Sequence, residues 1–318
     1  MTTIAQSSSS PTGAAMPQMT ATVGARRYDG PSSGWWFAGP AVAIIAVFFL
    51  APIAASILLS LTDFDIYALA DWQNLRFVGL QNYIQLFHTY RFWVALHNTL
   101  YFVAIGGPLS VAASLGAALL LESKLTRLKV VWRTVFFAPV VTTLVAVAIV
   151  WRYLYHTKYG LFNLALTKLG FEPIDWLGDP HWAMPAVILL AVWKNFGYNM
   201  IIFMAGLQSI PSELYEAAEV DGAGPARRFW HVTLPMLAPT FLFVGVTTII
   251  GFFQLFAEPY VMTQGGPEES TYSLVMLMYE QGFRWWRLGF ASAAAMTIFG
   301  ITLAATLAQV WLQRKSGV

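Results

Sequence analysis

The chain has 318 residues, of which 57% are apolar and only 11% are charged, far below the roughly 25% charged share of ordinary soluble domains. A net charge of +2, with 18 Lys and Arg scattered along the chain, argues against the basic stripe of a nucleic-acid-binding protein. The absence of cysteine excludes disulfides and thiolate metal sites.

The histidines show no metal-ligand pattern. The five are far apart in the sequence and no two stand at the i, i+4 spacing of a helical ligand pair. We therefore expect neither a metal site nor a cofactor. They are His88, His97, His156, His181 and His231.

The first 33 residues are rich in Ser, Thr, Ala and Gly and contain almost no large apolar side chain. Such a composition cannot bury enough surface to offset its ordering entropy, so residues 1–33 are expected to form a disordered cytoplasmic tail. Arg26 and Arg27 precede an apolar stretch over 34–61, which exceeds the length of a signal peptide and has no evident cleavage site. This stretch is expected to remain as a membrane helix.

Six apolar runs are long enough to cross a hydrocarbon core of roughly 30 Å. They lie near residues 34–61, 95–121, 131–153, 182–207, 236–262 and 288–312. The chain is therefore expected to be an all-α membrane protein, with a transmembrane domain over 34–312 and a cytoplasmic tail over 313–318. Prolines within or near these runs are expected to kink or end helices: Pro40, Pro52, Pro108, Pro139, Pro239 and Pro259.

The distribution of Lys and Arg predicts the orientation, because positively charged short loops stay in the cytoplasm. With the N-terminus inside, ten basic residues fall in cytoplasmic segments and seven in outside segments. Both termini are therefore expected to be cytoplasmic. The inside set is Arg26, Arg27, Lys124, Arg127, Lys129, Arg133, Arg227, Arg228, Arg314 and Lys315.

The expected outside loops, near 62–94, 154–181 and 263–287, are rich in amphipathic aromatic residues. These suit the headgroup level of a membrane, and they could also form a docking surface for an external partner. They are Trp72, Tyr83, Trp93, Tyr155, Trp176, Trp182, Trp285 and Trp286.

A polar segment, IPSELYEAAEVDGAGPARRFWHVTLP over 210–235, separates the fourth and fifth runs. Ser212–Val220 is predicted to be a short helix with Ser212 as its N-cap. Glu213 and Glu216 would lie near the positive end of its dipole. The sequence from Asp221 to Pro225 predicts a turn, after which a second helix leads into the fifth span.

This segment resembles the EAA loop of binding-protein-dependent ABC importer permeases, with Glu-Ala-Ala at 216–218, Gly222, and Val-Thr-Leu-Pro at 232–235. FVGLQNYIQLF (77–87), NTLYF (98–102) and MTQGGP (262–267) resemble motifs of the carbohydrate-type branch. Within that branch the resemblance is to the subunit type of the maltose-system F subunit and the glycerol-phosphate-system A subunit.

The resemblance implies the fold of a type I importer permease, with six spans and a cytoplasmic coupling helix in the loop 208–235. It also implies a plasma-membrane complex with a cytoplasmic ATPase in two copies, a second homologous permease, an external solute-binding protein and a sugar-class solute. No phosphate-binding loop is present, so ATP hydrolysis is expected on the separate ATPase. The implied coupling residues are Glu213, Glu216, Ala217, Ala218, Asp221, Gly222 and Pro235.

A sugar path needs polar side chains beside aromatic ones, and the fourth and fifth runs offer both. Thr248, Gly251, Phe252 and Leu255 would share one helical face. Gln254 and Glu258 would form an i, i+4 pair beside that face. The substrate-path candidates are Asn195, Tyr198, Asn199, Thr248, Gly251, Phe252, Gln254, Leu255 and Glu258.

Lys194 and Glu258 are ionisable residues within predicted spans, and such residues usually face a cavity or a partner. They could pair with each other, or Glu258 could line the path. Two other functions of apolar chains would require patterns of their own. An ion-gradient-driven secondary transporter usually shows internal repeats, and a membrane-embedded enzyme needs clustered His, Asp or Glu; neither pattern is evident.

Overall fold

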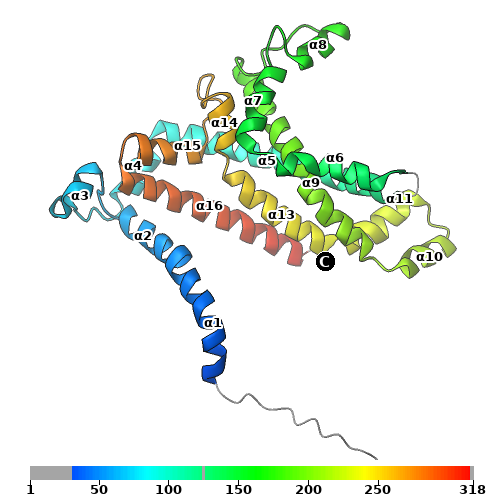
Figure 1. The fold of residues 1–318 in the computed structure, drawn as a ribbon, viewed down its shortest axis with the longest axis horizontal. Coiled ribbons are helices and arrows are strands. Elements are labelled where there is room, and N and C mark those ends of the chain that lie inside the picture. Colours follow the sequence, from blue (N-terminus) through cyan, green and yellow to red (C-terminus); the bar gives the residue numbers. More distant parts are fainter. Residues whose placement is uncertain (1–30, 124–125, 316–318) are drawn as a thin grey trace, which may run out of the picture. The chain divides into compact units, whose positions relative to one another are not determined.

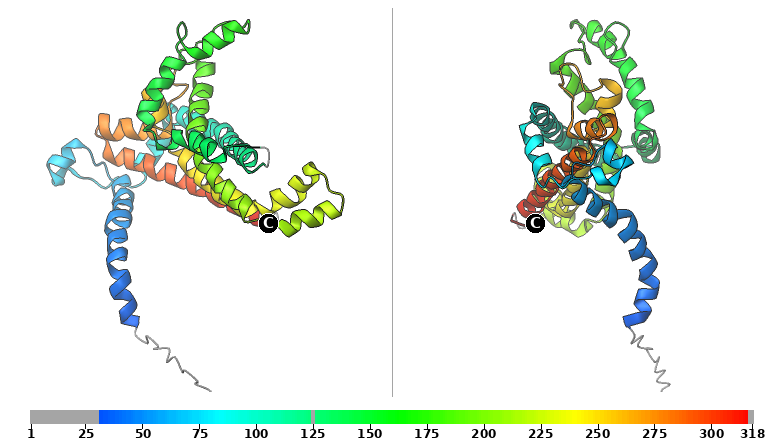
Figure 2. Two further views of the ribbon diagram at one scale, coloured as in Figure 1. Left: turned by 45° about the vertical axis from the view of Figure 1, so that its right-hand side comes forward. Right: turned by 90° about the vertical axis from the view of Figure 1, so that its left-hand side faces the viewer.

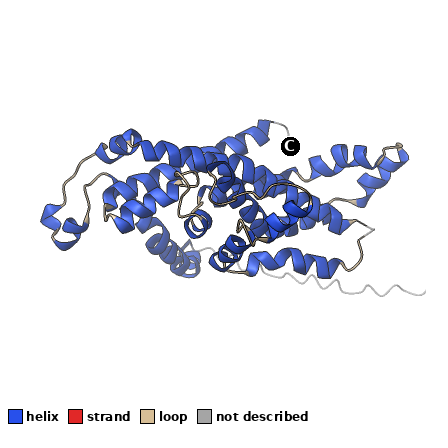
Figure 3. Cartoon of the chain, turned by 90° about the horizontal axis from the view of Figure 1, so that it is seen from above, coloured by secondary structure: helices blue, strands red, loops and turns tan. Residues whose placement is uncertain are grey.

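The computed structural model describes residues 31–123 and 126–315, and this part of the chain is helical throughout, with one isolated β-bridge and no strand. Figure 3 shows its helices joined by loops. The all-α class predicted from the sequence is therefore confirmed. The chain divides into two compact units, Met1–Ala51 and Pro52–Val318. The tail predicted over 1–33 lies outside the described residues except at its end.

The first predicted span is a helical stretch of three parts, α1 (Pro31–Ile45), the π-helical η1 (Ala46–Leu50) and α2 (Ala51–Ser60). Residues Ala38–Ser60 form a candidate membrane span with a mean hydropathy of 2.8. Pro31 is the first described residue and already belongs to α1, so the described end of the predicted tail, residues 31–33, is helical.

Three long unbroken helices run through the second unit: α5 (Tyr90–Glu122), α9 (Pro180–Gln208) and α16 (Leu288–Lys315). Each is apolar enough to cross a membrane. α5 starts five residues before its predicted limit, and α16 continues into the predicted tail 313–318, of which the last three residues are not described. α5 and α9 lie side by side (Figure 1). Buried Met200, Phe203 and Val244 pack α9 against its neighbours.

The third predicted span, 131–153, is not one helix. It is divided into α6 (Lys129–Val141) and α7 (Leu144–Leu154), which meet at an angle of 101°. Thr142 and Thr143 are extended at the break, and the Thr142 hydroxyl donates to the carbonyl oxygen of Pro139 at 2.6 Å. The same carbonyl also accepts from the backbone N–H of Thr142 at 3.3 Å, so it stays bonded at the break.

The fifth predicted span, 236–262, also differs from one continuous helix. α11 (Pro225–Arg228), η3 (Phe229–Thr233) and α12 (Leu234–Met236) lead into α13 (Ala238–Phe253), with a bend of 65° before α13. α13 ends at Phe253, and a separate short helix α14 (Ala257–Met262) follows. Between them, the Ser273 hydroxyl donates to the carbonyl oxygen of Leu255 at 2.5 Å. A side chain from a later loop thus pairs a carbonyl group in the break.

Short helices make up the loops that precede and follow the long ones. They are α3 (Ile66–Ala70), η2 (Trp72–Asn74), α4 (Gln81–His88), α8 (Leu161–Lys168), α10 (Ser212–Val220), α15 (Leu274–Tyr279) and η4 (Glu280–Arg284). Around α8, the buried Asn163 amide donates to Thr157 and Ile174 carbonyls and accepts from the Trp176 indole. Tyr155, expected at the membrane interface, is instead buried, with its hydroxyl donating to the Ala186 carbonyl at 2.9 Å.

Candidate functional site

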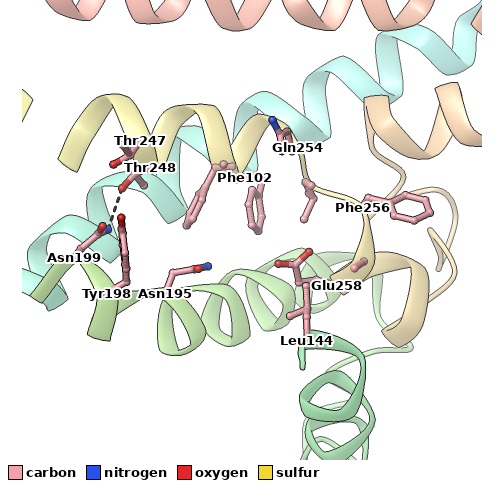
Figure 4. Close-up of a pocket in the computed structure, with 14 residues that line it drawn as sticks. Phe102, Leu144, Asn195, Tyr198, Asn199, Thr247, Thr248, Gln254, Phe256 and Glu258 are labelled. Carbon is pink, nitrogen blue, oxygen red and sulfur yellow. Dashed lines mark hydrogen bonds between the residues drawn. The ribbon is translucent and has the colours of Figure 1, made fainter. Parts of the chain in front are cut away.

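A cavity of about 500 Å³ lies between α9 and the α13–α14 segment, with Phe102 of α5 and Leu144 of α7 at its wall. All nine residues that the sequence suggested for a substrate path line it. Figure 4 shows them among the 14 lining residues, with the Asn195 amide and the Glu258 carboxylate directed into the space between α9 and α13. The structure thus brings together two segments that are about fifty residues apart in the sequence.

The polar wall of the cavity is held by a bond between its two helices. The Asn199 amide donates to the Thr248 hydroxyl at 3.0 Å, and both residues are buried. The bond is drawn as a dashed line in Figure 4. Asn195 lies about one turn before Asn199 and donates to the Ala191 carbonyl of its own helix at 2.9 Å. These amides and the Tyr198 hydroxyl provide donors and acceptors of the kind that sugar hydroxyls need.

The opposite wall is aromatic. The rings of Phe102 and Phe252 have centroids 4.9 Å apart, and Gly106 lets them pack this closely. A Cβ at Gly106 would lie 2.9 Å from the Phe252 ring, closer than real contacts allow. Phe256 also lines the cavity, but Figure 4 shows its ring turned away from the polar wall, and the ring stacks on Tyr260 at 5.0 Å. Polar groups facing flat apolar rings form the usual lining of a small-molecule site.

The helix break at 254–256 corrects two local expectations. Leu255 is 2% exposed and lies beyond the end of α13, so it does not continue a helical face with Thr248 and Phe252. Gln254 is the C-cap of α13 and Glu258 lies in the first turn of α14. They are therefore not an i, i+4 pair on one helix, although both line the same cavity.

Lys194 has a different partner from the one expected. Its ammonium donates to the carbonyl oxygens of Pro139 and Val140 at 2.8 and 3.1 Å. These carbonyls end α6, where the helix dipole is negative. None of the ion pairs found among the described residues includes Lys194 or Glu258, so the two form no direct ion pair, although their charges act on each other through space.

A second feature is the hairpin of α10 and α11 that follows the C-terminal end of α9, which Figure 2 shows as two helices side by side. Gly222, at φ +75°, ends α10. The N–H of Ala223 bonds to the Ala218 carbonyl at 2.8 Å and that of Gly222 to the Glu219 carbonyl at 3.0 Å. This is a Schellman motif, which favours glycine at its left-handed position.

The start of α10 differs from expectation. Pro211 is its N-cap and Ser212 is already helical, with no side-chain capping bond. Gly224 and Pro225 begin α11 as the sequence suggested. Most of the suggested coupling residues are exposed, on the hairpin or, for Pro235, on α12 after it. Exposed are Glu213, Glu216, Ala217, Asp221, Gly222 and Pro235, whereas Ala218 is half-buried.

Two side-chain contacts brace the hairpin, and sequence reasoning missed both. Arg228 donates to the Glu219 carboxylate at 3.0 Å. The hydroxyls of Tyr215 and Thr233 lie 3.0 Å apart, and Thr233 is buried. The polar composition of residues 210–235 predicted helices outside the membrane, but it did not identify which side chains would pair.

The loop that carries the GGP turn is fastened to α5. Arg91 lies 2.6 Å from the Glu269 carboxylate, and the Asn98 amide donates to the carbonyls of Glu269 and Tyr272 at 2.7 and 3.0 Å. Burial, together with a 2.7 Å hydrogen bond to the Glu280 carboxylate, raises the pKa of the Tyr272 hydroxyl. The described residues contain no cluster of three or more His, Asp or Glu that could hold a metal ion.

Comparison with known proteins places these features in context. Residues 110–317 match the model of a family described as "Binding-protein-dependent transport system inner membrane component". The chain is 37% identical over 286 residues to the lactose transport system permease protein LacF of Rhizobium radiobacter, covering 89% of this chain and 93% of that protein.

Two further relatives show similar agreement. The chain is 33% identical to the arabinooligosaccharides transport system permease protein AraP of Bacillus subtilis, covering 88% of each chain. It is also 33% identical to the sn-glycerol-3-phosphate transport system permease protein UgpA of Yersinia pseudotuberculosis, covering 87% of this chain and 92% of that protein. Among solved structures, a chain of a bacterial ABC transporter that imports the acidic polysaccharide alginate has the same fold. Its TM-score is 0.74 at 22% identity, over 89% of this chain and 96% of that one.

Proposed function

The chain belongs to the family of inner membrane components of binding-protein-dependent transport systems, and from that premise we propose that it is one permease subunit of an ATP-driven importer of a sugar or sugar derivative. The family match confirms the resemblance drawn from residues 210–235. The observation that carries the sugar proposal is the cavity, whose amide and hydroxyl groups lie beside the rings of Phe102 and Phe252. The names of the relatives, which transport lactose, arabino-oligosaccharides and glycerol phosphate, support the same class.

In this proposal, the hairpin of α10 and α11 docks on a cytoplasmic ATPase present in two copies. Its exposed Glu216 and Ala217 would seat in a groove of that subunit, as short helices do when they bind a partner. The hairpin follows the end of α9, whereas α8 precedes the start of the same helix. A helix of 29 residues is about 44 Å long, so the two ends of α9 suit opposite sides of a membrane.

The proposed orientation puts both chain termini and α10 in the cytoplasm and α8 outside. A second, homologous permease would complete the solute path, and an external binding protein would deliver the solute to the outside loops. One solved relative of the same fold is a complex with an alginate pentasaccharide-bound periplasmic protein, which supports this arrangement.

The test is reconstitution of this chain with its ATPase, second permease and binding protein in proteoliposomes. We expect the uptake of a labelled sugar to require ATP on the side of the membrane that carries the ATPase. This uptake should persist when ionophores collapse the ion gradients. Uptake by this chain alone, driven by a proton or sodium gradient, would instead show a secondary transporter.

A further inference from the structure

The charge of the cavity lining is one-sided. Glu258 contributes a carboxylate, and none of the 14 lining residues, all within the described part of the chain, is Lys, Arg or His. The remaining polar groups are neutral amides and hydroxyls, as in Asn195, Tyr198 and Gln254. Sugar hydroxyls can bond to all of these groups, whereas an anion would meet a like charge.

The charges of Lys194 and Glu258 act on each other through space, but Lys194 adds no charge to the cavity wall itself. It precedes Asn195 on α9, yet its side chain is not part of the cavity lining. Its ammonium bonds to the carbonyls of Pro139 and Val140, where it also balances the negative end of the α6 dipole. These bonds leave the ammonium charged, but they hold it outside the wall that a solute would touch.

Recognition of phosphate, sulfonate or carboxylate groups normally uses Arg or Lys in charge-assisted hydrogen bonds, or the N-terminus of a helix. The helix that begins at the cavity is α14, and Glu258 itself occupies its first turn. An anion that enters this partly desolvated cavity loses part of its hydration, and the lining offers no positive side chain to compensate for that loss. A neutral sugar carries no charge to desolvate, and its hydroxyls can bond to the lining groups.

We infer that this cavity selects uncharged, polyhydroxylated sugars and rejects anionic ones, with Glu258 acting as a charge filter and as an acceptor for sugar hydroxyls. The inference rests on the proposed function, since it specifies the solute class of the same path. It separates this chain from relatives whose names specify charged solutes, such as the glycerol-phosphate permease and the acidic alginate importer.

The chain contains no cysteine, so a single Asn195→Cys substitution gives a thiol inside the cavity without background from this subunit. The assembled transporter would be treated in membrane vesicles with cationic 2-aminoethyl and anionic 2-sulfonatoethyl methanethiosulfonate. Neutral methyl methanethiosulfonate first establishes the accessible state. Rates are divided by those with a free thiol in solution, so that only the surroundings of the cysteine contribute.

We expect the cationic reagent to react about tenfold faster than the anionic one, because a nearby carboxylate attracts one and repels the other. Adding Glu258→Gln should reduce the ratio to within about twofold of unity. Glu172→Gln removes the same charge from an exposed loop outside the cavity and should leave the ratio unchanged. Equal rates in the Asn195→Cys protein, or a ratio insensitive to Glu258→Gln, would overturn the inference.

Uptake provides an independent arm. In proteoliposomes containing the complete transporter, import of sn-glycerol 3-phosphate would overturn the charge filter, whereas import of lactose without glycerol phosphate supports it. The labelling ratio does not depend on any solute. Suppose that the transporter imports no sugar but the cationic reagent still reacts faster than the anionic one. The proposed function would then be refuted, whereas the inference about the charge of the cavity would stand.

Discussion

The ammonium of Lys194 on α9 lies 2.8 Å from the carbonyl oxygen of Pro139, in the last turn of α6 and close to the 101° break that separates α6 from α7. A hydrogen bond from a charged group is worth more than one between neutral groups, so this contact fastens the end of α6 to α9. The helix that bears much of the cavity is thereby joined to the point where the neighbouring span changes direction.

Lys194→Met should destabilise the protein by about 1 to 3 kcal/mol, because it keeps the apolar stem and removes the donor to two carbonyls. The readout is the thermal unfolding midpoint of the purified chain in detergent. Lys168→Met, at an exposed position on α8, is the matched control and should be neutral. An unchanged unfolding midpoint for both variants would mean that the Lys194 contact does not contribute to stability.

Glu216→Lys should abolish docking of the ATPase while leaving membrane insertion normal, because it reverses charge on the exposed face of α10. We expect the amount of ATPase that co-purifies to fall by about tenfold or more, as for a mispaired charge in an interface. Glu172→Lys makes the same change in another exposed loop and should co-purify normally. If Glu216→Lys assembles and transports like the parent, α10 does not contact the ATPase.

Gly222→Val should lose solute-stimulated ATP hydrolysis in the assembled complex. Gly222 has φ +75°, where a β-branched residue is strained by roughly 1 to 2 kcal/mol. The Schellman turn would then redirect α11. Gly224→Val is the control, because Gly224 has φ −68° and a Cβ there would meet no atom within 4 Å. Equal loss in both variants would point to exposed surface rather than backbone conformation as the cause.

Gln254→Ala should leave assembly intact and change the dependence of transport on solute concentration, because Gln254 is an exposed residue of the cavity lining. Loss of one sugar hydrogen bond should raise the half-saturating concentration by about five- to tenfold. The measurement is uptake at graded solute concentrations beside co-purification of the ATPase. If the variant fails to assemble, the role of Gln254 is in folding or assembly and not in solute binding.

Local sequence signals predicted the hairpin well, since Gly222, Gly224 and Pro225 determine turn geometry through their own backbones. Membership of the cavity was also predictable, because polar and aromatic residues are unusual together in apolar spans. The ends of the spans were not. The break after Phe253 involves the Ser273 hydroxyl, which reaches the carbonyl of Leu255 from 18 residues further along the chain.

The partner of Lys194 escaped prediction for a similar reason. A charged residue in a span suggests an opposite charge, and Glu258 was the available one. The carbonyls of Pro139 and Val140 accept from the ammonium instead, and no side-chain pattern in the sequence identifies which carbonyls at a helix end receive such a bond.

The two braces of the hairpin have a mechanical consequence. Because Tyr215 is held to Thr233 and Glu219 to Arg228, α10 cannot swing on its glycine turn without breaking these bonds. If a partner displaced α10, these bonds would carry the displacement to η3 and α12, and the 65° bend joins those elements to α13, whose far end reaches the cavity at Phe252. In the proposed importer, movement of the hairpin would therefore shift the wall that a solute touches.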